Sequence, residues 1–220
     1  MLQFYIHLHK LKIRFSLVCT IHNSTNLTSQ EKILSVARET ILTEAKAIAN
    51  LEQLLDQNFA EAVQAVYRSK GRVIITGIGK SAAIATKIVA TFNSTGTPAI
   101  FMHAADAIHG DLGTILQEDV VICISKSGNT PEIKVLVPLI KNFGNTLIAI
   151  TGNPESFLGL QANYTLNTFV EKEACPNNLA PTTSTTAQLV MGDALAVCLL
   201  QLRGFSSSDF ARYHPGGALG

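Results

Sequence analysis

Short apolar runs alternate with longer amphipathic stretches from residue 72 onward. The runs lie at 73–76, 98–102, 120–124, 146–150 and 164–170. The first four are continuous rather than alternating, which is typical of strands buried on both faces of a parallel sheet. Helical patterns occur at 80–93, 131–143, 154–162, 184–203 and 207–213. The alternation predicts an α/β domain built on a doubly wound, five-stranded parallel sheet.

The segment before the first strand predicts an N-terminal helical arm. An apolar residue recurs every seven positions, at Leu34, Ile41, Ile48 and Leu55. Such a stripe packs on the core or on another subunit. Thr28 and Glu31 have the spacing of a capping box, and Asn58 with Glu61 repeats it for a second helix that ends near 70–71.

The first 28 residues form a leader that we expect to be poorly ordered, followed by one domain at 29–220. Basic residues in the leader precede the apolar run 15–19, but the run is short and no cleavage site follows, which argues against a signal peptide. We expect no membrane span, because the apolar stretches fall short of the ~18–20 residues required. The four cysteines form no CxxC pair, which favours a reducing, cytoplasmic setting.

Charge changes the picture in one respect. Seventeen Lys and Arg residues against sixteen Asp and Glu residues give a formal net charge of +1. No dense basic run is present, which argues against nucleic-acid binding. Charged residues make up 15% of the chain, well below the usual share of about 25%. We therefore expect other subunits to cover part of the surface.

The loop after the first strand, 76–82, carries two closely spaced glycines. It is similar to a Walker A loop, but Ile74 stands where that motif requires a glycine five residues before Gly79. It also matches the dinucleotide fingerprint G-x-G-x-x-A, but the acidic residue expected near 101–103 is absent. What remains is a tight turn that places Lys80 at the start of a helix facing a ligand, against the alternative of a solvated lysine.

The loop after the third strand, 125–132, has the composition of a phosphate-binding turn. Its hydroxyls come from Ser125, Ser127 and Thr130. Gly128 permits close approach of the backbone, Thr130 suits the N-cap, and Pro131 suits the first helical position. The helix dipole favours an anion there. Glu132 is either a partner of that dipole or a carboxylate that faces the ligand.

Histidine and acidic residues on the remaining loops complete the candidate chemistry. They lie at His103, at His109 beside a glycine, at 171–173 and at His214. None has the spacing of a catalytic metal site. A phosphate site with histidine, glutamate and lysine nearby suits transfer of a proton between neighbouring carbons of a phosphorylated sugar by general acid–base catalysis.

Nine segments resemble the sugar isomerase (SIS) domain of the bacterial D-arabinose 5-phosphate isomerases, over about residues 30–220. The two most specific are Lys172-Glu-Ala-Cys-Pro176 and His214-Pro-Gly-Gly-Ala-Leu-Gly220. The others are 77–81, 91–98, 107–113, 124–128, 150–156, 180–186 and 191–196. The resemblance implies interconversion of D-ribulose 5-phosphate and D-arabinose 5-phosphate through an enediol, as the first step of Kdo biosynthesis for lipopolysaccharide or capsule.

The resemblance also implies roles for individual residues. The family's catalytic positions fall on Lys80, Glu132, Glu173, His214 and His109. Its substrate and phosphate positions fall on Ser81, Gly96, Thr97, His103, Ser125, Ser127, Gly128 and Thr130. No cofactor is implied. His103 matches a position that takes up a metal, which we expect to be inhibitory. The family pattern further implies a homo-oligomer, a tetramer.

Two departures from the family and two alternatives stay open. The phosphate loop has Lys126, Asn129 and Pro131 where relatives often carry other polar residues. The chain ends where longer members continue into a paired CBS module, so CMP-Kdo, a downstream sugar, is a candidate feedback ligand at or beside the active site. The alternatives are a phosphosugar-binding regulator without activity and an isomerase for another phosphosugar.

Overall fold

The computed structural model of the chain describes residues 28–216, so most of the predicted leader lies outside the described residues. The chain divides after Glu39 into two compact units, and the division falls within helix α2 (Ser29–Leu54). The predicted capping box at its start is confirmed. The Glu31 N–H donates to Thr28 Oγ1 at 3.2 Å, and the Thr28 N–H donates to the Glu31 carboxylate at 2.8 Å.

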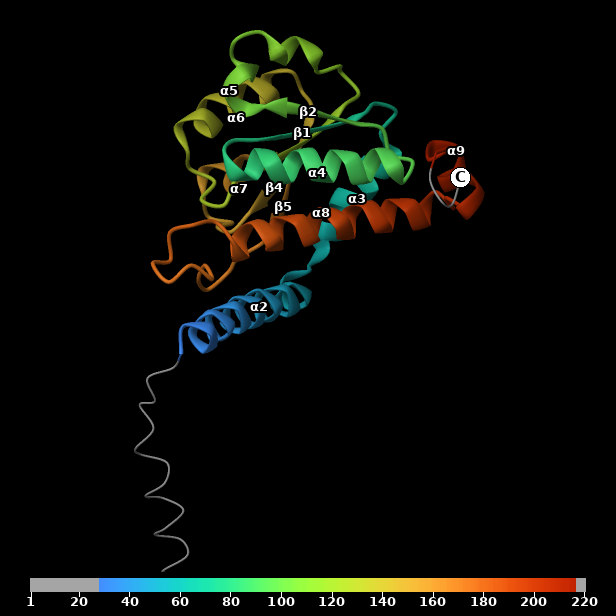
Figure 1. Cartoon of the computed structure of the whole chain (residues 1–220). Coiled ribbons are helices and arrows are strands. Elements are labelled where there is room, and N and C mark those ends of the chain that lie inside the picture. Colours follow the sequence, from blue (N-terminus) through green and yellow to red (C-terminus); the bar gives the residue numbers. More distant parts are fainter. Residues whose placement is uncertain (1–27, 217–220) are drawn as a thin grey trace, which may run out of the picture. The chain divides into compact units, whose positions relative to one another are not determined.

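Five parallel strands form the sheet of the second unit in the order β2-β1-β3-β4-β5 (Figure 1). They are β1 (Val73–Gly77), β2 (Ala99–His103), β3 (Val120–Ile124), β4 (Thr146–Thr151) and β5 (Tyr164–Asn167). All five residues of β1 and of β3 are buried. The predicted doubly wound, five-stranded parallel sheet is therefore confirmed.

Helices cover both faces of this sheet. The helices that follow α2 are α3 (Gln57–Arg68), α4 (Lys80–Ser94), α5 (Ala104–Ala107), the 3₁₀ helix η1 (Asp111–Thr114), α6 (Pro131–Asn142), α7 (Phe157–Gln161), α8 (Thr183–Leu202) and α9 (Ser207–Tyr213). Ile75 and Ile122 face one core with α3, α4 and α8. Ile74 and Val121 face the other core with α5, α6 and α7. Successive strand residues point to opposite faces, so two helical layers explain the continuous apolar runs.

Three predicted boundaries shift because side chains end or begin the elements. The N-cap of α3 is Asp56 rather than Asn58, whose side-chain amide donates to the Asp56 carboxylate at 3.0 Å. Helix α7 starts later than predicted, after Ser156, whose hydroxyl accepts the Gly159 N–H. Strand β5 stops at Asn167 because its side chain accepts the Phe169 N–H at 2.9 Å, forming a local turn.

Helix α8 corrects the expectation that every apolar stretch is too short for a membrane span. Its 20 residues are long and apolar enough to cross a membrane, by length and composition alone. Nine of them are buried in this structure, including Met191 and Leu195, which belong to the core shared with α4. The core helix of a globular domain can be as long and as apolar as a membrane span. Helix α8 lies against the sheet domain, as a core helix does (Figure 1).

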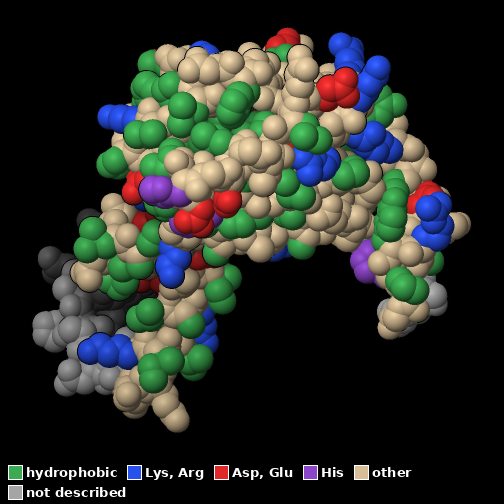
Figure 2. All heavy atoms as spheres, turned by 90° about the horizontal axis from the view of Figure 1, so that it is seen from above, with side chains coloured by type: hydrophobic (Ala, Val, Ile, Leu, Met, Phe, Trp, Pro, Cys, Tyr) green, Lys and Arg blue, Asp and Glu red, His purple; other side chains and the backbone are tan. Residues whose placement is uncertain are grey.

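Several large hydrophobic side chains are left exposed on helices and loops. Ile41 of α2 is 67% exposed, Leu179 in the loop before α8 is 79% exposed, and Val197 of α8 is 55% exposed. Figure 2 shows hydrophobic side chains scattered among charged ones over the visible face. Of the predicted heptad stripe, Ile48 is half-buried and Leu55 lies beyond the end of α2. The stripe therefore packs on the core only in part.

The close approach of α4 and α8 depends on a glycine. A Cβ atom at Gly192 would lie 2.3 Å from Ile88 Cδ1 and 2.5 Å from Ile88 Cγ1. Ile88 is fully buried in the core, so it has no free space into which to move.

We expect Gly192→Val to lower the free energy of unfolding by about 1–3 kcal/mol, the usual effect of overpacking a core. Gly113→Ala is the matched control, because a Cβ at Gly113 meets no atom within 4 Å. Urea unfolding followed by circular dichroism measures both. Equal stability of the two variants would contradict this account of the helix contact.

Candidate active site

The candidate site lies at the carboxyl edge of the sheet, where the strand order reverses. β1 has β2 on one side and β3 on the other, and Gly77 at the end of β1 is paired with Ile124 at the end of β3. The chain leaves β1 toward α4 and β3 toward α6, and these two helices pack on opposite faces of the sheet. Ligands of open parallel sheets bind at such a point.

The phosphate loop, 125–130, is held in shape by its own side chains. The buried Ser125 hydroxyl accepts the Gly128 N–H at 3.1 Å, and the Ser127 hydroxyl accepts the Asn129 N–H at 3.3 Å. Gly128 has a φ of +64°, and a Cβ there would lie 2.0 Å from Ser156 Oγ. The loop therefore requires glycine at this position.

The N-terminus of α6 closes the phosphate loop as the sequence predicts. Thr130 is the N-cap and Pro131 the first helical residue. The Thr130 hydroxyl does not cap the helix, and it is buried without a hydrogen-bond partner among the described residues. The N–H groups at the start of this 12-residue helix, beside the unpaired Thr130 hydroxyl, form a favourable environment for an anion.

The loop between β1 and α4 presents Lys80 at the site. Gly79 precedes the helix with a φ of +59°, and Lys80 is its exposed first residue. Ser81, predicted to bind phosphate, donates its hydroxyl to Gln188 Oε1 of α8 at 3.2 Å. In this structure Ser81 ties α4 to α8, and Lys80 is the residue of the loop that is available to a ligand.

Glu132 is a carboxylate without a partner. It is the second residue of α6, directly after the phosphate loop, and it is half-buried. Within residues 28–216 its side chain takes part in no hydrogen bond and no ion pair. Its lone pairs are thus open to accept a proton.

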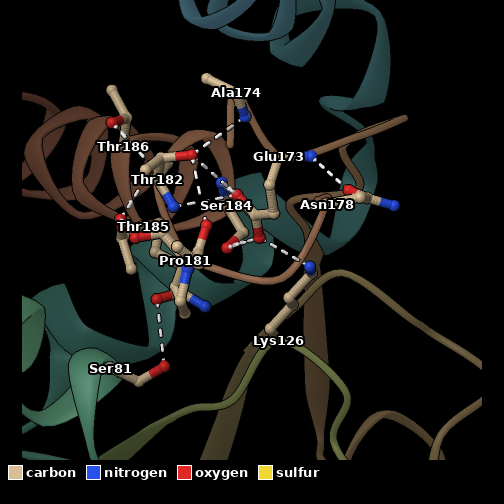
Figure 3. A network of polar contacts seen from close by, with 12 residues as sticks. Ser81, Lys126, Glu173, Ala174, Asn178, Pro181, Thr182, Ser184, Thr185 and Thr186 are labelled. Carbon is tan, nitrogen blue, oxygen red and sulfur yellow. Dashed lines mark hydrogen bonds and ion pairs between the residues drawn. The ribbon is translucent and has the colours of Figure 1, made fainter. Parts of the chain in front are cut away.

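Glu173 has the opposite surroundings. Its buried carboxylate lies at the N-terminus of α8, where it accepts the Thr182 N–H at 2.9 Å and the Ser184 N–H at 3.1 Å (Figure 3). The Ser184 hydroxyl donates to Oε1 at 2.5 Å, and Lys126 Nζ of the phosphate loop lies 2.6 Å from the same oxygen. Lys126 and Glu173, which are 47 positions apart in the sequence, thus connect two loops of the candidate site.

These contacts set the acidity of Glu173. Burial raises the pKa of the carboxyl. The hydrogen bonds from Lys126, from the Ser184 hydroxyl and from the Thr182 and Ser184 amides lower the pKa by more than burial raises it. The net result is a pKa of about 2 against an ordinary value of 4.5. The side chain is therefore ionised throughout the physiological pH range.

His103 and His109 flank the short helix α5 at the end of β2. His103 Nδ1 is 3.6 Å from a carboxylate oxygen of Asp106, and His109 is exposed. Among residues 28–216, no group of three His, Cys, Asp or Glu side chains gathers in a way that would hold a metal ion. His103, the predicted metal ligand, therefore has one carboxylate neighbour, and the metal site stays a prediction.

Three predicted site residues lie elsewhere, beside the C-terminal end of α8. Thr97 Oγ1 is 3.4 Å from Arg203 Nε, and a Cβ at Gly96 would lie 2.6 Å from the Phe205 ring. His214 follows α9 and stacks on Phe210 with ring centroids 3.9 Å apart. Figure 1 shows α9 at the end of α8 remote from the loop that carries Glu173. The 20 residues of α8 correspond to about 30 Å.

The local contacts of His214 fix which ring nitrogen is free. Nδ1 lies 2.9 Å from the Phe210 carbonyl oxygen. A carbonyl only accepts, so Nδ1 carries the proton, and Nε2 of the neutral ring keeps its lone pair. The imidazole is thus prepared to accept a proton through Nε2.

The partners of Glu173 were not predicted from the sequence. Lys126 was expected only to be a departure from relatives, and Thr182, Ser184 and Asn178 were not candidate site residues. Asn178 Oδ1 accepts the Glu173 N–H at 2.7 Å. A signal was present in the run of hydroxyl residues at 182–186, at the start of an apolar helix. Such residues are typical of a helix start and of the donors that a nearby carboxylate needs.

Comparisons with known proteins agree with this geometry. The family model described as SIS domain matches residues 66–198. Arabinose 5-phosphate isomerase KdsD of Pseudomonas aeruginosa is 50% identical over 195 residues, 89% of this chain and 60% of the relative. The KdsD of Francisella tularensis is 53% identical over 187 residues, 84% of this chain and 57% of the relative. The chain thus spans less than two thirds of the length of these relatives.

A solved structure gives the same result in three dimensions. An Escherichia coli CFT073 protein in complex with arabinose 5-phosphate is 38% identical, with a TM-score of 0.79 over 86% of this chain and 100% of that chain. The family model covers more than half of the residues, and the sheet order and loops match the expected fold. The chain therefore belongs to the SIS domain family.

Proposed function

We propose that the protein is an aldose–ketose isomerase that interconverts D-ribulose 5-phosphate and D-arabinose 5-phosphate through an enediol, in the first step of Kdo biosynthesis. The observation that carries this proposal is the unpartnered carboxylate of Glu132 directly beside a phosphate loop. The names of the KdsD relatives and the arabinose 5-phosphate complex of the Escherichia coli protein support the choice of substrate.

The geometry suggests how the chain would carry out this reaction. Ser125, Ser127 and Thr130, with the first amides of α6, hold the phosphate. A base takes the proton from the carbon beside the carbonyl and returns it to the neighbouring carbon, while a second acid–base group moves the hydroxyl proton between the two oxygens. Lys80 supplies a positive charge for the enediolate oxygen.

The open position of Glu132 argues against one of the two alternatives, the regulator without activity, but does not distinguish between phosphosugar substrates. A regulator that only binds a phosphosugar requires the phosphate loop but no unpaired carboxylate beside it. An isomerase for another phosphosugar would use the same site. Incubation with a panel of ketose phosphates, followed by identification of the aldose formed, separates all three.

Glu132→Gln should lower kcat for D-ribulose 5-phosphate by about 100- to 10,000-fold, the usual effect of losing a general acid–base group. The thermal midpoint should stay unchanged, because Glu132 makes no hydrogen bond within the described residues. Glu155→Gln, which removes an exposed carboxylate of the β4–α7 turn, is the control and should keep full activity. Normal turnover in Glu132→Gln would reject the assignment.

We further propose that the active protein is a homo-oligomer, a tetramer, whose sites are shared between subunits. Within one subunit, α9, whose C-cap is His214, lies at the end of α8 remote from the loop that carries Glu173 (Figure 1). Exposed hydrophobic residues on α2 and α8, among them Ile41 and Val197, supply surface for subunit contacts. A second copy would bring its Gly96, Thr97 and His214 to the Glu132 loop, and each site would then contain the full residue set.

Mixing two inactive variants tests the shared site. Glu132→Gln and His214→Ala should each be inactive alone, and their co-expressed mixture should recover about a quarter of wild-type activity, since half of randomly formed symmetric pairs are mixed and each mixed pair holds one intact site. The assay uses the whole mixture at equal expression of the two variants, with size-exclusion chromatography for the assembly. A mixture as inactive as its parents would show that no site is shared.

Feedback by CMP-Kdo remains part of the proposal. Its phosphodiester and carboxylate groups are anionic, as the phosphate loop and the α6 N-terminus require. We expect CMP-Kdo to raise the apparent KM for D-ribulose 5-phosphate without changing kcat. A titration in which the substrate does not displace CMP-Kdo would reject CMP-Kdo as a feedback ligand at this site.

The setting proposed for the protein is the cytoplasm, without membrane or nucleic-acid partners. The low net charge and the absence of a dense basic run in the sequence support this setting. So does the placement of α8 within the core rather than apart from it.

A further inference from the structure

Glu173 matches a catalytic position of the family, but its carboxylate is already saturated. An ionised carboxylate offers about four lone-pair sites. Oε1 accepts from Ser184 Oγ and Lys126 Nζ, and Oε2 accepts from two backbone amides and, at 3.3 Å, from Thr182 Oγ1. Five donors therefore occupy the lone pairs that would have to accept a proton from a sugar carbon.

The burial of Glu173 adds to this restriction. The residue is 2% exposed, and its side chain is fully covered. Figure 3 shows the carboxylate enclosed by the start of α8 and by Lys126. To act as a base it would have to leave these donors, at a cost of about 1.5–3 kcal/mol for each hydrogen bond to a charged group.

We propose that Glu173 is a positioning residue, which joins the N-terminus of α8 to the phosphate loop through Lys126, and that it does not transfer the substrate proton. This inference rests on the proposed isomerase function and deepens it. Proton transfer at carbon then falls to the groups with open lone pairs, Glu132 and Nε2 of His214.

The connection through Lys126 reaches the residues that hold the phosphate. Lys126 stands between Ser125 and Ser127, and its carbonyl accepts the Gly152 N–H at 3.0 Å. The backbone of Lys126 is thus fixed to the β4–α7 turn, and its ammonium group is fixed to Glu173. Loss of either charge should loosen the phosphate loop and weaken substrate binding more than it slows proton transfer.

The test compares Glu173→Gln, Lys126→Met and the double variant with wild type and with Glu155→Gln as control. We measure kcat, KM for D-ribulose 5-phosphate, the pH dependence of kcat/KM and the thermal midpoint. Glu173→Gln should raise KM several-fold, lower kcat less than 10-fold and keep the acidic limb of the pH profile. The double variant should be little worse than Glu173→Gln, because both changes break the same contact.

Lys126→Met gives a readout that does not depend on Glu173→Gln folding. If Glu173 were the base, removing the adjacent cation would raise its pKa and move the acidic limb of kcat/KM to higher pH. For a positioning residue the limb stays in place and KM rises. A shifted limb, or a 100- to 10,000-fold loss of kcat in Glu173→Gln at unchanged KM and thermal midpoint, would overturn the inference.

Acid unfolding tests the positioning role even if the protein fails to convert D-ribulose 5-phosphate. Lys126 is the charged group that contacts Glu173, and α8 contributes only amides and hydroxyls. Because the folded-state pKa is lowered from 4.5 to about 2, the stabilisation is complete above pH 4.5 and is lost as the pH falls toward 2. Wild type and Glu155→Gln should lose stability over this range, and Glu173→Gln should lose less. Equal losses in all three would contradict the positioning role, whereas wild-type inactivity alone would reject only the isomerase.

Discussion

The lateral pairing of β1 with β3 is the contact on which the rest of the site depends. Gly77 and Ile124 end their strands side by side, so the loops that carry Lys80 and Ser125 start from the same place. A parallel pair requires a long crossover connection, here from α4 through η1 (Lys80–Thr114). The backbone geometry of one strand pair thus brings together groups that are 45 positions apart in the sequence, as for Lys80 and Ser125.

Helix α8 extends this arrangement in two directions. Its N-terminus holds Glu173, and through it Lys126, at the carboxyl edge of the sheet. Its C-terminus leads to Arg203, beside Thr97, and then to His214. A buried helix of fixed length therefore separates two groups of family residues within one subunit. The proposed sharing of sites between subunits would bring the two groups to one reaction.

The strands and the phosphate loop followed from local patterns. Buried runs such as 120–124 need no distant information, and Thr130-Pro131 marks a helix start by its own chemistry. The ends of α7 and β5 were harder, because single side chains, Ser156 and Asn167, decide them. The Lys126–Glu173 contact depends on strand order, which no local pattern contains. The family resemblance named Glu173 but gave no information on how many donors surround it.

Buried hydroxyl groups without partners gather at the carboxyl edge of the sheet. In the part of the chain described here they include Thr76, Thr130, Thr168 and Thr183. Each buried polar group left unpaired costs about 1–3 kcal/mol, so these hydroxyls favour a ligand that supplies hydrogen-bond partners. A ligand rich in oxygen atoms relieves part of that cost when it binds. A substitution that paired or removed these hydroxyls would then stabilise the domain and weaken its affinity for such a ligand.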